Sequence, residues 1–341
     1  MVTIKEIASQ LGVSPTTVSN VINGRTGKMS AQTRQRIEDA LWENHYKVAG
    51  KSSRGVSSEE NMVAVAFYMG ILKEVLMDPF CGELLGAIQR AVKSHGHYMI
   101  YDVPVDIEDM ARLFAPWNVN GGIVLGYEPD QCEQLQKKIG KPIVFVDSYF
   151  GQGEEPYDNI GLQDYEGARE ITSYMLKMGH RRIAFFCDQS PAIASNLERL
   201  RGFKDALAAY DLKFSEKDFY YMVPDKNLRH EGFRQFARKN AKQYSAAFFI
   251  SDYFANEAVG IFMSQGLQVP DDLSVTGFDD NVYARLSRPM LTTVRQSPSE
   301  KGKCAVEMLM KRIRGEEVLL RTLQLPTELV VRDSVKNILR S

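Results

Sequence analysis

The sequence predicts a small all-α helix-turn-helix head followed by an α/β body of two lobes, each built on a doubly wound parallel sheet. Two observations lead to this fold class. Near the N-terminus three short amphipathic segments follow one another closely, whereas after about residue 62 short apolar runs alternate with helical segments in two successive series. A length of 341 residues leaves room for two or three domains, and 44% hydrophobic with 25% charged residues is ordinary for a globular protein.

The first helical segment begins at Thr3. Thr3 and Glu6 have the spacing of a capping box, in which each side chain bonds the backbone N–H of the other residue. The apolar residues after this cap recur at the spacing of one buried helix face: Ile4, Ile7, Ala8 and Leu11. Gly12 then provides a stop, so a helix is predicted between Thr3 and Gly12.

The second segment starts at Ser14, a good helix-capping residue, and Pro15, which is tolerated at the first helical position. Most residues after Pro15 are β-branched or small and polar, and these types rank low in helix propensity. The predicted buried face is Val18, Val21 and Ile22, and the predicted outward face is Pro15, Thr16, Ser19, Asn20 and Asn23. A third segment begins near Ser30 and is expected to bury Ile37, Leu41 and Tyr46. Two helices joined by a three-residue turn, with a third across them, form a helix-turn-helix unit.

The outward face of the second helix explains its composition. Short hydroxyl and amide side chains let a helix approach the major groove closely and hydrogen-bond to base edges and phosphates. We therefore predict a DNA interface that comprises Thr3, Ser14, Pro15, Thr16, Thr17, Ser19, Asn20 and Asn23. Up to Val56 the chain has eight lysines and arginines against four acidic residues, although its whole net charge is −1. The alternatives are a small structural bundle and a chance asymmetry of surface charge.

The remainder of the chain has the pattern of an α/β protein. Apolar, strand-like runs occur at residues 62–68, 98–102, 121–125 and 142–146, with helical segments between them. The pattern starts again after about residue 157, with runs near residues 183, 246 and 273. Two doubly wound sheets in tandem imply two lobes, and such sheets bind ligands at the carboxyl ends of their strands. We expect a ligand site between the lobes.

The sequence gives little support to enzyme or membrane classes. It contains no P-loop, nucleophile elbow, HExxH or dinucleotide-binding fingerprint, and we expect no cofactor or metal. The four cysteines are scattered and are expected to be reduced and buried: Cys81, Cys132, Cys187 and Cys304. No apolar run approaches the roughly 20 residues that span a bilayer, and the N-terminus lacks the features of a signal peptide. These observations predict a cytoplasmic protein without a membrane partner.

Six stretches between the N-terminus and residue 334 occur in the order typical of one family. They are TIKEIASQLGVSPTTVSNVING (3–24), GHRRIAFF (179–186), ERLRGF (198–203), VPDDLSVTGFDD (269–280), LTTVRQ (291–296) and LPTELVVRDS (325–334). On these motifs the chain resembles the lac/gal repressor family of bacterial transcription regulators over essentially its whole length. The resemblance implies a periplasmic-binding-protein-like body, in which the chain crosses between the lobes near residues 160, 290 and 322.

The same resemblance implies the domain division. The helix-turn-helix domain would comprise residues 1–46, the linker 47–61 and the body 62–341. Within the body, lobe 1 would comprise about 62–160 and 291–321, and lobe 2 about 161–290 and 322–341.

The resemblance also implies which side chains hold a small-molecule effector. The matching positions are Phe80, Asp147, Arg199, Ser251, Asp252 and Asp279. Carboxylates and a guanidinium bind vicinal hydroxyls in paired geometry, and an aromatic ring covers the apolar face of a sugar, so the expected effector is a carbohydrate. Structural alternatives are turn or helix capping for the aspartates, an ion pair for the arginine and core packing for the phenylalanine. Ser251 stands where the family often has an asparagine, and Asn120 where it usually has an acid.

The linker departs from the family pattern. It lacks the proline and the leucines with which the family forms a short DNA-bound helix, and Gly50 and Gly55 disfavour any helix there. Lys51 and Arg54 remain as candidates to neutralise phosphates or enter a narrow minor groove. We expect at most a weak helix in the linker on DNA.

Together these observations predict a homodimeric transcriptional regulator and, since most family members repress, a repressor. Its affinity for a near-palindromic DNA operator would be set by a carbohydrate effector between the lobes. Two other functions are weighed against this one: a cytoplasmic sugar-binding protein and a sugar-acting enzyme on the same two-lobed fold. The head argues against the first, and the lack of a catalytic motif argues against the second.

Overall fold

The structure is a computed structural model of the chain. It describes residues 3–22, 25, 29–43, 61–67, 78–114, 119–126, 129–148, 157–192, 194–316 and 322–339. The chain divides into a head unit, which comprises Met1–Met62 with Trp117–Asn120, and a larger body unit, and each is described by itself.

The head contains three helices, as the sequence predicts. They are α1 (Ile4–Leu11), α2 (Pro15–Ile22) and α3 (Ala31–Glu43). The capping box of α1 is confirmed, because Thr3 and Glu6 bond each other's backbone N–H groups, and Gly12 ends the helix with a φ of 68°. The N–H of Thr17 donates to Oγ of Ser14 (3.0 Å), which confirms the start of α2.

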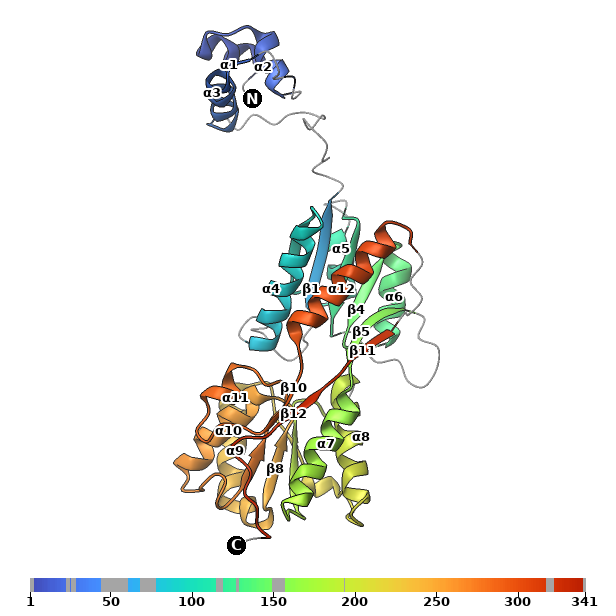
Figure 1. Ribbon diagram of the computed structural model, residues 1–341, viewed down its shortest axis with the longest axis vertical. Coiled ribbons are helices and arrows are strands. Elements are labelled where there is room, and N and C mark those ends of the chain that lie inside the picture. The colour runs from blue at the N-terminus through green and yellow to red at the C-terminus, as the bar shows by residue number, and fades with distance from the viewer. Residues whose placement is uncertain are drawn as a thin grey trace. The chain divides into compact units, whose positions relative to one another are not determined.

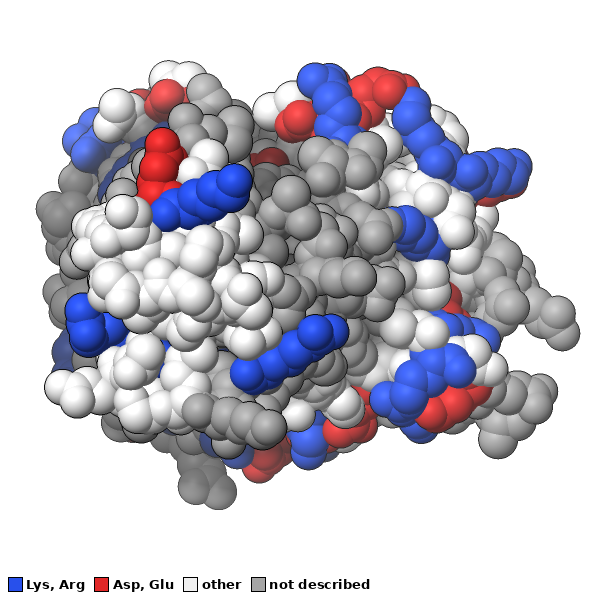
Figure 2. Space-filling model, turned by 90° about the horizontal axis from the view of Figure 1, so that it is seen from above, with Lys and Arg blue, Asp and Glu red and all other residues white. Residues whose placement is uncertain are grey.

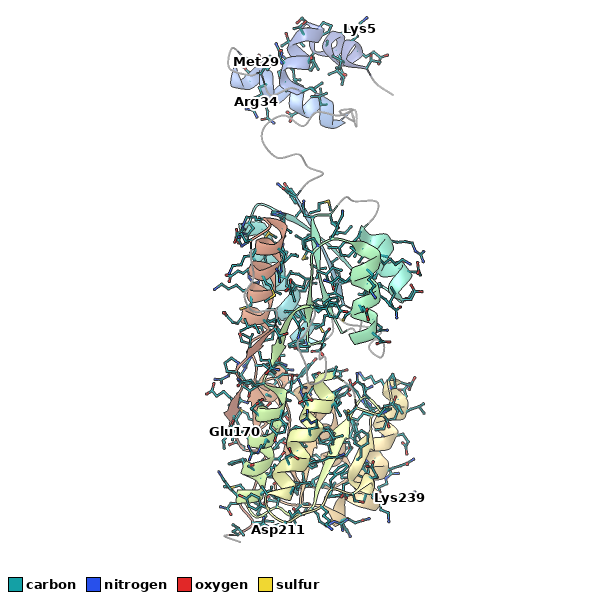
Figure 3. All side chains as sticks on the ribbon, turned by 90° about the vertical axis from the view of Figure 1, so that its right-hand side faces the viewer. Lys5, Met29, Arg34, Glu170, Asp211 and Lys239 are labelled. Carbon is teal, nitrogen blue, oxygen red and sulfur yellow. The ribbon has the colours of Figure 1, made fainter. Side chains whose placement is uncertain are left out.

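A single apolar core holds the three helices together. Its members are Ile7, Ala8, Val18, Val21, Ile22, Ile37 and Ala40. Met29 and Leu41 pack against this core, and Figure 3 shows Met29 in the head. The side chains of Lys5 and Arg34, also labelled there, are exposed. The predicted buried face of α2 is therefore confirmed, whereas Tyr46 lies outside the described residues. Helicity of α2 comes from this packing, since its own residues disfavour a helix.

The first lobe of the body contains a six-stranded sheet with the order β11-β5-β4-β3-β1-β2. Its strands are β1 (Met62–Phe67), β2 (Tyr98–Asp102), β3 (Gly121–Leu125), β4 (Ile143–Val146), β5 (Asp158–Leu162) and β11 (Thr322–Leu325). The pairs β1–β3, β3–β4, β4–β5 and β5–β11 are parallel. Its helices are α4 (Pro79–Ser94), α5 (Ile107–Phe114), α6 (Pro129–Ile139) and α12 (Pro298–Ile313). Helices α4 and α12 pack together on one face of the sheet, and α5 and α6 on the other (Figure 1).

The second lobe contains a parallel sheet with the order β7-β6-β8-β9. Its strands are β6 (Ile183–Cys187), β7 (Phe219–Tyr221), β8 (Ala246–Phe249) and β9 (Ser274–Thr276). Its helices are α7 (Asp164–Lys177), α8 (Ala194–Ala208), α9 (Lys226–Gln235), α10 (Asp252–Ser264) and α11 (Val282–Leu286). A π turn (Phe236–Asn240) and short 3-10 turns (Glu216–Asp218, Ala241–Gln243) complete it. Two doubly wound sheets are thus present, which confirms the predicted fold class.

Three segments link the two sheets. The first runs from β5 into α7, and the others contain β10 (Thr293–Arg295) and β12 (Glu328–Val330), which pair antiparallel. Because β11 pairs with β5 as far as Leu325, the third crossing lies beyond Leu325, slightly later than the approximate position of 322. The carboxyl ends of β4, β6 and β9 are followed by Asp147, Asp188 and Asp279, which sets the positions of the site residues below.

Close packing of α7 on α8 depends on Gly202. A Cβ added at this position would lie 2.2 Å from the backbone oxygen of Tyr165, and backbone yields less readily than a side chain. We expect Gly202→Ala to lower the free energy of unfolding by about 2 kcal/mol or more, as overpacking does. Urea denaturation measures this. Gly232→Ala is the control, since nothing lies within 4 Å of a Cβ there and a helical Ala should stabilise by about 0.5–1 kcal/mol. Equal effects of the two variants would contradict the proposed role of Gly202.

Candidate DNA-binding and effector-binding sites

The predicted DNA-contacting residues that the structure describes lie at the start of α1, directly before α2 and within α2. Thr3, Ser14, Pro15 and Thr16 are exposed, and Thr17, Ser19 and Asn20 are half-buried, whereas Asn23 lies outside the described residues. Some of these hydroxyls already serve the helices, because Oγ1 of Thr3 bonds Oε2 of Glu6 (2.9 Å) and Oγ of Ser14 bonds Oγ1 of Thr17 (2.8 Å). Pro15 and Thr16 are exposed in the first turn of α2, and Asn20 lies one turn later on the same helix.

Basic side chains for the phosphates are exposed on the head. Lys5, Arg25, Arg34 and Arg36 are all exposed, and Figure 3 shows Lys5 and Arg34 projecting from α1 and α3. On the face shown in Figure 2, described basic and acidic residues are interspersed and form no continuous patch of one sign. The predicted contacts of Lys51 and Arg54 lie outside the described residues.

Arg199 is held rigidly in the second lobe. It lies on α8, and its Nε donates to Oδ1 of Asp164 (2.8 Å) while Nη1 donates to the carbonyl of Ile250 (2.6 Å). Its guanidinium stacks on the ring of Phe278, 3.8 Å from the centroid. The ion pair is thus buried, unlike the exposed helix pair considered as the alternative, and it fixes the guanidinium at the carboxyl ends of the strands.

A chain of hydrogen bonds joins Asp147 of the first lobe to Asp279 of the second. Nζ of Lys301 donates to both oxygens of Asp147 (2.7 and 2.9 Å) and to Oε1 of Gln296 (3.1 Å). Nε2 of Gln296 then donates to Oδ1 of Asp279 (2.6 Å). Both aspartates have positive φ, 55° and 119°, a strained conformation that often marks functional positions. Side chains of the two lobes are therefore connected through Lys301 and Gln296.

The acidic side chains of this region affect one another's pKa values and that of Cys81. Burial raises the pKa of Asp279 to about 7, which the Arg199 charge opposes and the Asp78 charge reinforces. Burial also raises the pKa of Asp147, against the effect of the Lys301 ammonium. Burial, followed by the charges of Asp78, Asp279 and Asp147, raises the pKa of the Cys81 thiol. These groups surround the first turn of α4.

Phe80 lies in that first turn. Its ring is half-buried and Nζ of Lys301 lies 5.1 Å from the ring centroid. Asp78 caps the helix by accepting the N–H of Phe80 (2.9 Å), and burial raises the pKa of Asp78 while the Arg199 charge opposes this. Because the ring packs against the core yet remains partly exposed, its role as a sugar-facing surface stays a prediction.

Asp188 and its neighbours complete the site. Asp188 follows β6, and Nδ2 of Asn196 donates to its Oδ1 (2.9 Å) and to Oε1 of Gln189 (3.0 Å). Burial raises the pKa of Asp188 to about 6, although the Arg199 charge lowers it. Four residues of this region were not predicted from the sequence: Asp78, Asp188, Gln296 and Lys301. An acid directly after an apolar strand was the available signal for Asp188, as it was for Asp147.

Two predicted effector residues have structural roles. Oγ of Ser251 accepts the N–H of Phe254 and so caps α10. Asp252 is fully buried, and its carboxylate accepts from Oγ1 of Thr293 (2.6 Å) and from the N–H of Asn281 (3.0 Å). Its oxygens therefore face the chain and hold β10 against the loop after β9. These bonds tie the start of α10 to the interlobe link, and contact of Asp252 with an effector stays a prediction.

Asn120 and Asp280 also have structural partners. The side-chain oxygen of Asn120 accepts the N–H of Met62 (3.1 Å) at the start of β1. Asp280 is ion-paired with Arg295 (2.8 Å) and with Arg332, so its carboxylate is engaged within the fold. Among the described residues no group of histidines, cysteines and acids could hold a metal ion. Three cysteines are buried as predicted, whereas Cys304 is half-buried.

Two family models match the chain. "Bacterial regulatory proteins, lacI family" matches residues 3–48, and "Periplasmic binding protein-like domain" matches residues 172–335. Among curated relatives, the HTH-type transcriptional regulator CelR of Thermobifida fusca is 27% identical over 97% of this chain and 98% of its own length. The HTH-type transcriptional repressor PurR of Aliivibrio fischeri (strain MJ11) is 29% identical over the full length of both chains. The chain belongs to the LacI family.

Solved structures agree with this LacI-family assignment. A CelR–cellobiose complex matches with a TM-score of 0.72 and 25% identity over 98% of this chain and 100% of that one. A lac repressor dimer bound to operator and the anti-inducer ONPF matches with a TM-score of 0.74 over 98% and 99%, and at 22% identity it supports the fold. As a LacI-family member with a helix-turn-helix head, the chain is a DNA-binding transcriptional regulator and not an enzyme. No described helix has the length and apolar character needed to cross a bilayer.

Proposed function

We propose that this regulator is a repressor that binds a near-palindromic operator as a homodimer and releases or engages it in response to a small-molecule effector. The observation that carries the proposal is the hydrogen-bond chain from Asp147 through Lys301 and Gln296 to Asp279. A ligand that bonds to these aspartates would contact both lobes at once. It would then favour one arrangement of the lobes, which is the differential interaction that allosteric control requires.

A carbohydrate is the effector class that this chemistry supports. Carboxylates accept hydrogen bonds from vicinal hydroxyls, and Phe80 offers a partly exposed ring for the apolar face of a sugar. The solved complex of CelR with cellobiose is a related precedent. We propose Phe80, Asp147, Arg199 and Asp279 as effector-binding residues, together with Asp188, and Ser251 as a neighbour whose hydroxyl is occupied in capping.

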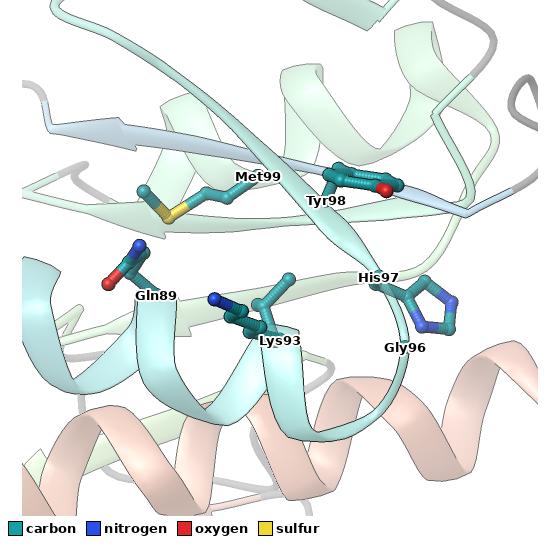
Figure 4. A pocket seen from close by; sticks show the side chains of 7 residues that line it. Gln89, Lys93, Gly96, His97, Tyr98 and Met99 are labelled. Carbon is teal, nitrogen blue, oxygen red and sulfur yellow. The ribbon is translucent and has the colours of Figure 1, made fainter. Parts of the chain in front are cut away.

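The homodimer has support from exposed apolar surface in both lobes. In the first lobe the edge strand β2 and the residues after it expose Tyr98 (66%) and Val105 (76%). Beside β2 the end of α4 forms a hollow of about 440 Å³, and Figure 4 shows Lys93, His97 and Tyr98 around it. In the second lobe the exposed apolar residues include Val282, Leu286, Met290 and Val331. Contact with a second copy would cover such surfaces.

The domain division is part of the proposal. We assign the helix-turn-helix domain to residues 1–46, the linker to 47–61 and the two-lobed body to 62–341. The first segment of the head unit ends at Met62, which is the first residue of the body in this assignment. Movement of the lobes would change the spacing of the two heads and thereby the affinity for the operator. Because a bacterial regulator meets its operator in the cytoplasm, we place the protein there.

Asn20 provides a test of the DNA-binding proposal. Asparagine pairs bidentately with adenine, whereas arginine pairs with guanine, and each such pair discriminates by about 1–3 kcal/mol. We expect Asn20→Arg to move the preferred half-site toward guanine at one position. Selection of binding sites from random DNA measures the preference and also shows whether half-sites occur in pairs, as a dimer requires.

The control for this experiment is Ser9→Arg. Ser9 is exposed on α1, so this variant adds the same charge outside α2. It should strengthen binding with little sequence preference and a steeper salt dependence. An unchanged preferred sequence in Asn20→Arg would remove Asn20 from the base-reading set, and unpaired half-sites would contradict the dimer.

A further inference from the structure

The effector site contains an excess of acidic side chains. Five aspartates take part in the interactions described above, against two cations: Asp78, Asp147, Asp164, Asp188 and Asp279 with Arg199 and Lys301. The net charge of a site decides which ligands enter it, because charges interact strongly where water is excluded. What matters is which of these charges are already paired within the fold.

Both cations are paired with acids of the protein. Lys301 is 1% exposed, and its ammonium donates three hydrogen bonds, two to Asp147 and one to Gln296. Since an ammonium has three hydrogens, Lys301 can bind a ligand only by giving up one of these bonds. Arg199 is ion-paired with Asp164, whose side chain is 1% exposed. Neither cation offers an uncompensated charge to an anionic ligand.

Three acids have no such partner among the described residues. Asp78, Asp188 and Asp279 form no ion pair with a described lysine or arginine, and their hydrogen-bond donors are uncharged: the Phe80 N–H, the Asn196 amide and the Gln296 amide. Burial raises the pKa of each, which shows that each ionised carboxylate is poorly compensated. A ligand that donates hydrogen bonds, or carries positive charge, would stabilise them.

We propose that the effector is a polyhydroxylated molecule without an anionic group, either neutral or bearing an ammonium, and that the uncompensated carboxylates exclude phosphorylated and carboxylated analogues. This inference rests on the proposed effector function and narrows it. Exclusion arises from like-charge repulsion, because the two cations that the described part of the site contains are already paired. The repulsion therefore acts against anionic ligands.

The test compares matched sets of sugars on the full-length protein by thermal shift and calorimetry. Two sets contain a neutral sugar, its amino form and its phosphate: glucose, glucosamine and glucose 6-phosphate, and galactose, galactosamine and galactose 6-phosphate. A third set pairs neutral cellobiose with its carboxylate, cellobionate. We expect binding only among neutral and amino members, with the anionic member at least tenfold weaker. Tighter binding of any anionic member than of its neutral counterpart would overturn the inference.

A second measurement does not depend on finding the right sugar. Tris, a polyhydroxylated ammonium, and inorganic phosphate are compared at equal ionic strength on wild type, Asp188→Asn and Asp211→Asn. Asp211 is exposed and follows α8, whereas the acids of the site follow β4, β6 and β9. Asp211→Asn therefore changes the net charge of the protein by the same amount without removing an acid of the site. Tris should raise the Tm of wild type and Asp211→Asn more than that of Asp188→Asn, and phosphate should not raise it. Stabilisation by phosphate, or no loss of the Tris effect in Asp188→Asn, would overturn the inference.

Failure of the proposed function would look different. If no sugar binds but Tris raises the Tm of wild type more than that of Asp188→Asn, the site has the inferred charge and the proposal of a carbohydrate effector is wrong. If an anionic sugar binds and alters operator affinity, the effector function holds and the charge inference fails.

Discussion

Lys301→Met should lower the free energy of unfolding of the body by about 3–5 kcal/mol. The substitution removes the ammonium that both oxygens of Asp147 accept from, and it leaves that carboxylate in a site where its side chain is only 16% exposed. Breaking a buried ion pair on one side costs about this much, because the remaining charge has lost its partner. Gln296 also loses a donor to its Oε1. Urea denaturation followed by circular dichroism measures the change.

The double variant Lys301→Met with Asp147→Asn separates charge from packing. With both charges gone, methionine fills most of the space of the lysine stem and the unpaired carboxylate no longer exists, so at least half of the lost stability should return. Lys303→Met is the matched control, since Lys303 is exposed on the same helix and should change stability by no more than about 0.5 kcal/mol. A single variant as stable as wild type, or a double variant less stable than Lys301→Met, would show that the pair does not hold this site together.

The elements that the sequence predicted are those with strong local patterns. The head helices follow from the Thr3–Glu6 capping box and from the spacing of Val18, Val21 and Ile22. Seven apolar runs became β1, β2, β3, β4, β6, β8 and β9. The strands that were not predicted are short or mixed in composition, such as β5 (Asp158–Leu162), which starts with two polar residues and contains a glycine. Their strand conformation comes from pairing with neighbours, which no local pattern displays.

The effector site was harder to predict because its residues act through partners far away in the chain. Lys301 lies 154 residues from Asp147, and nothing local to either residue reveals the pair. A signal did exist: Lys301, Ala305 and Met308 have the spacing of one helix face, and a lysine within an apolar stripe indicates a buried partner. Asp252 is a different case, because its motif position predicts a ligand contact while the hydrogen bonds within the fold that its oxygens accept could not be predicted from that motif.

Asp279 and Asp280 should respond in opposite directions to the same substitution. Burial raises the pKa of Asp279 from 3.8 to about 7, so the folded protein binds this proton more tightly than the unfolded chain does. Between about pH 4 and pH 7 the folded state therefore holds more protons, and this group makes the protein less stable as the pH rises. Asp279→Asn removes the charge, and asparagine tolerates a positive φ and can still accept from Gln296.

We expect Asp279→Asn to raise the unfolding free energy at pH 8 by on the order of 2 kcal/mol, with the gain disappearing near pH 4 to 5. One pKa unit corresponds to about 1.4 kcal/mol, and part of the shift is shared with the acids nearby. The same variant should weaken effector binding, because a carboxylate that accepts ligand hydroxyls is lost. Stability and function would then oppose each other at this residue, as they often do at binding sites.

Asp280→Asn provides the matched comparison at the next residue. The Asp280 side chain is 3% exposed and is ion-paired with Arg295 and Arg332, so its loss leaves the largely buried Arg332 guanidinium without its partner. We expect a loss of about 2–4 kcal/mol at pH 8 and no gain at any pH. Thermal and urea denaturation of both variants at pH 5 and pH 8 give the result. If both variants lose stability at pH 8, Asp279 is a structural acid like its neighbour. If Asp279→Asn is more stable than wild type only at pH 8, the Asp279 carboxylate lowers the stability of the wild-type protein. Binding of the effector would then explain why an acid stands at this position.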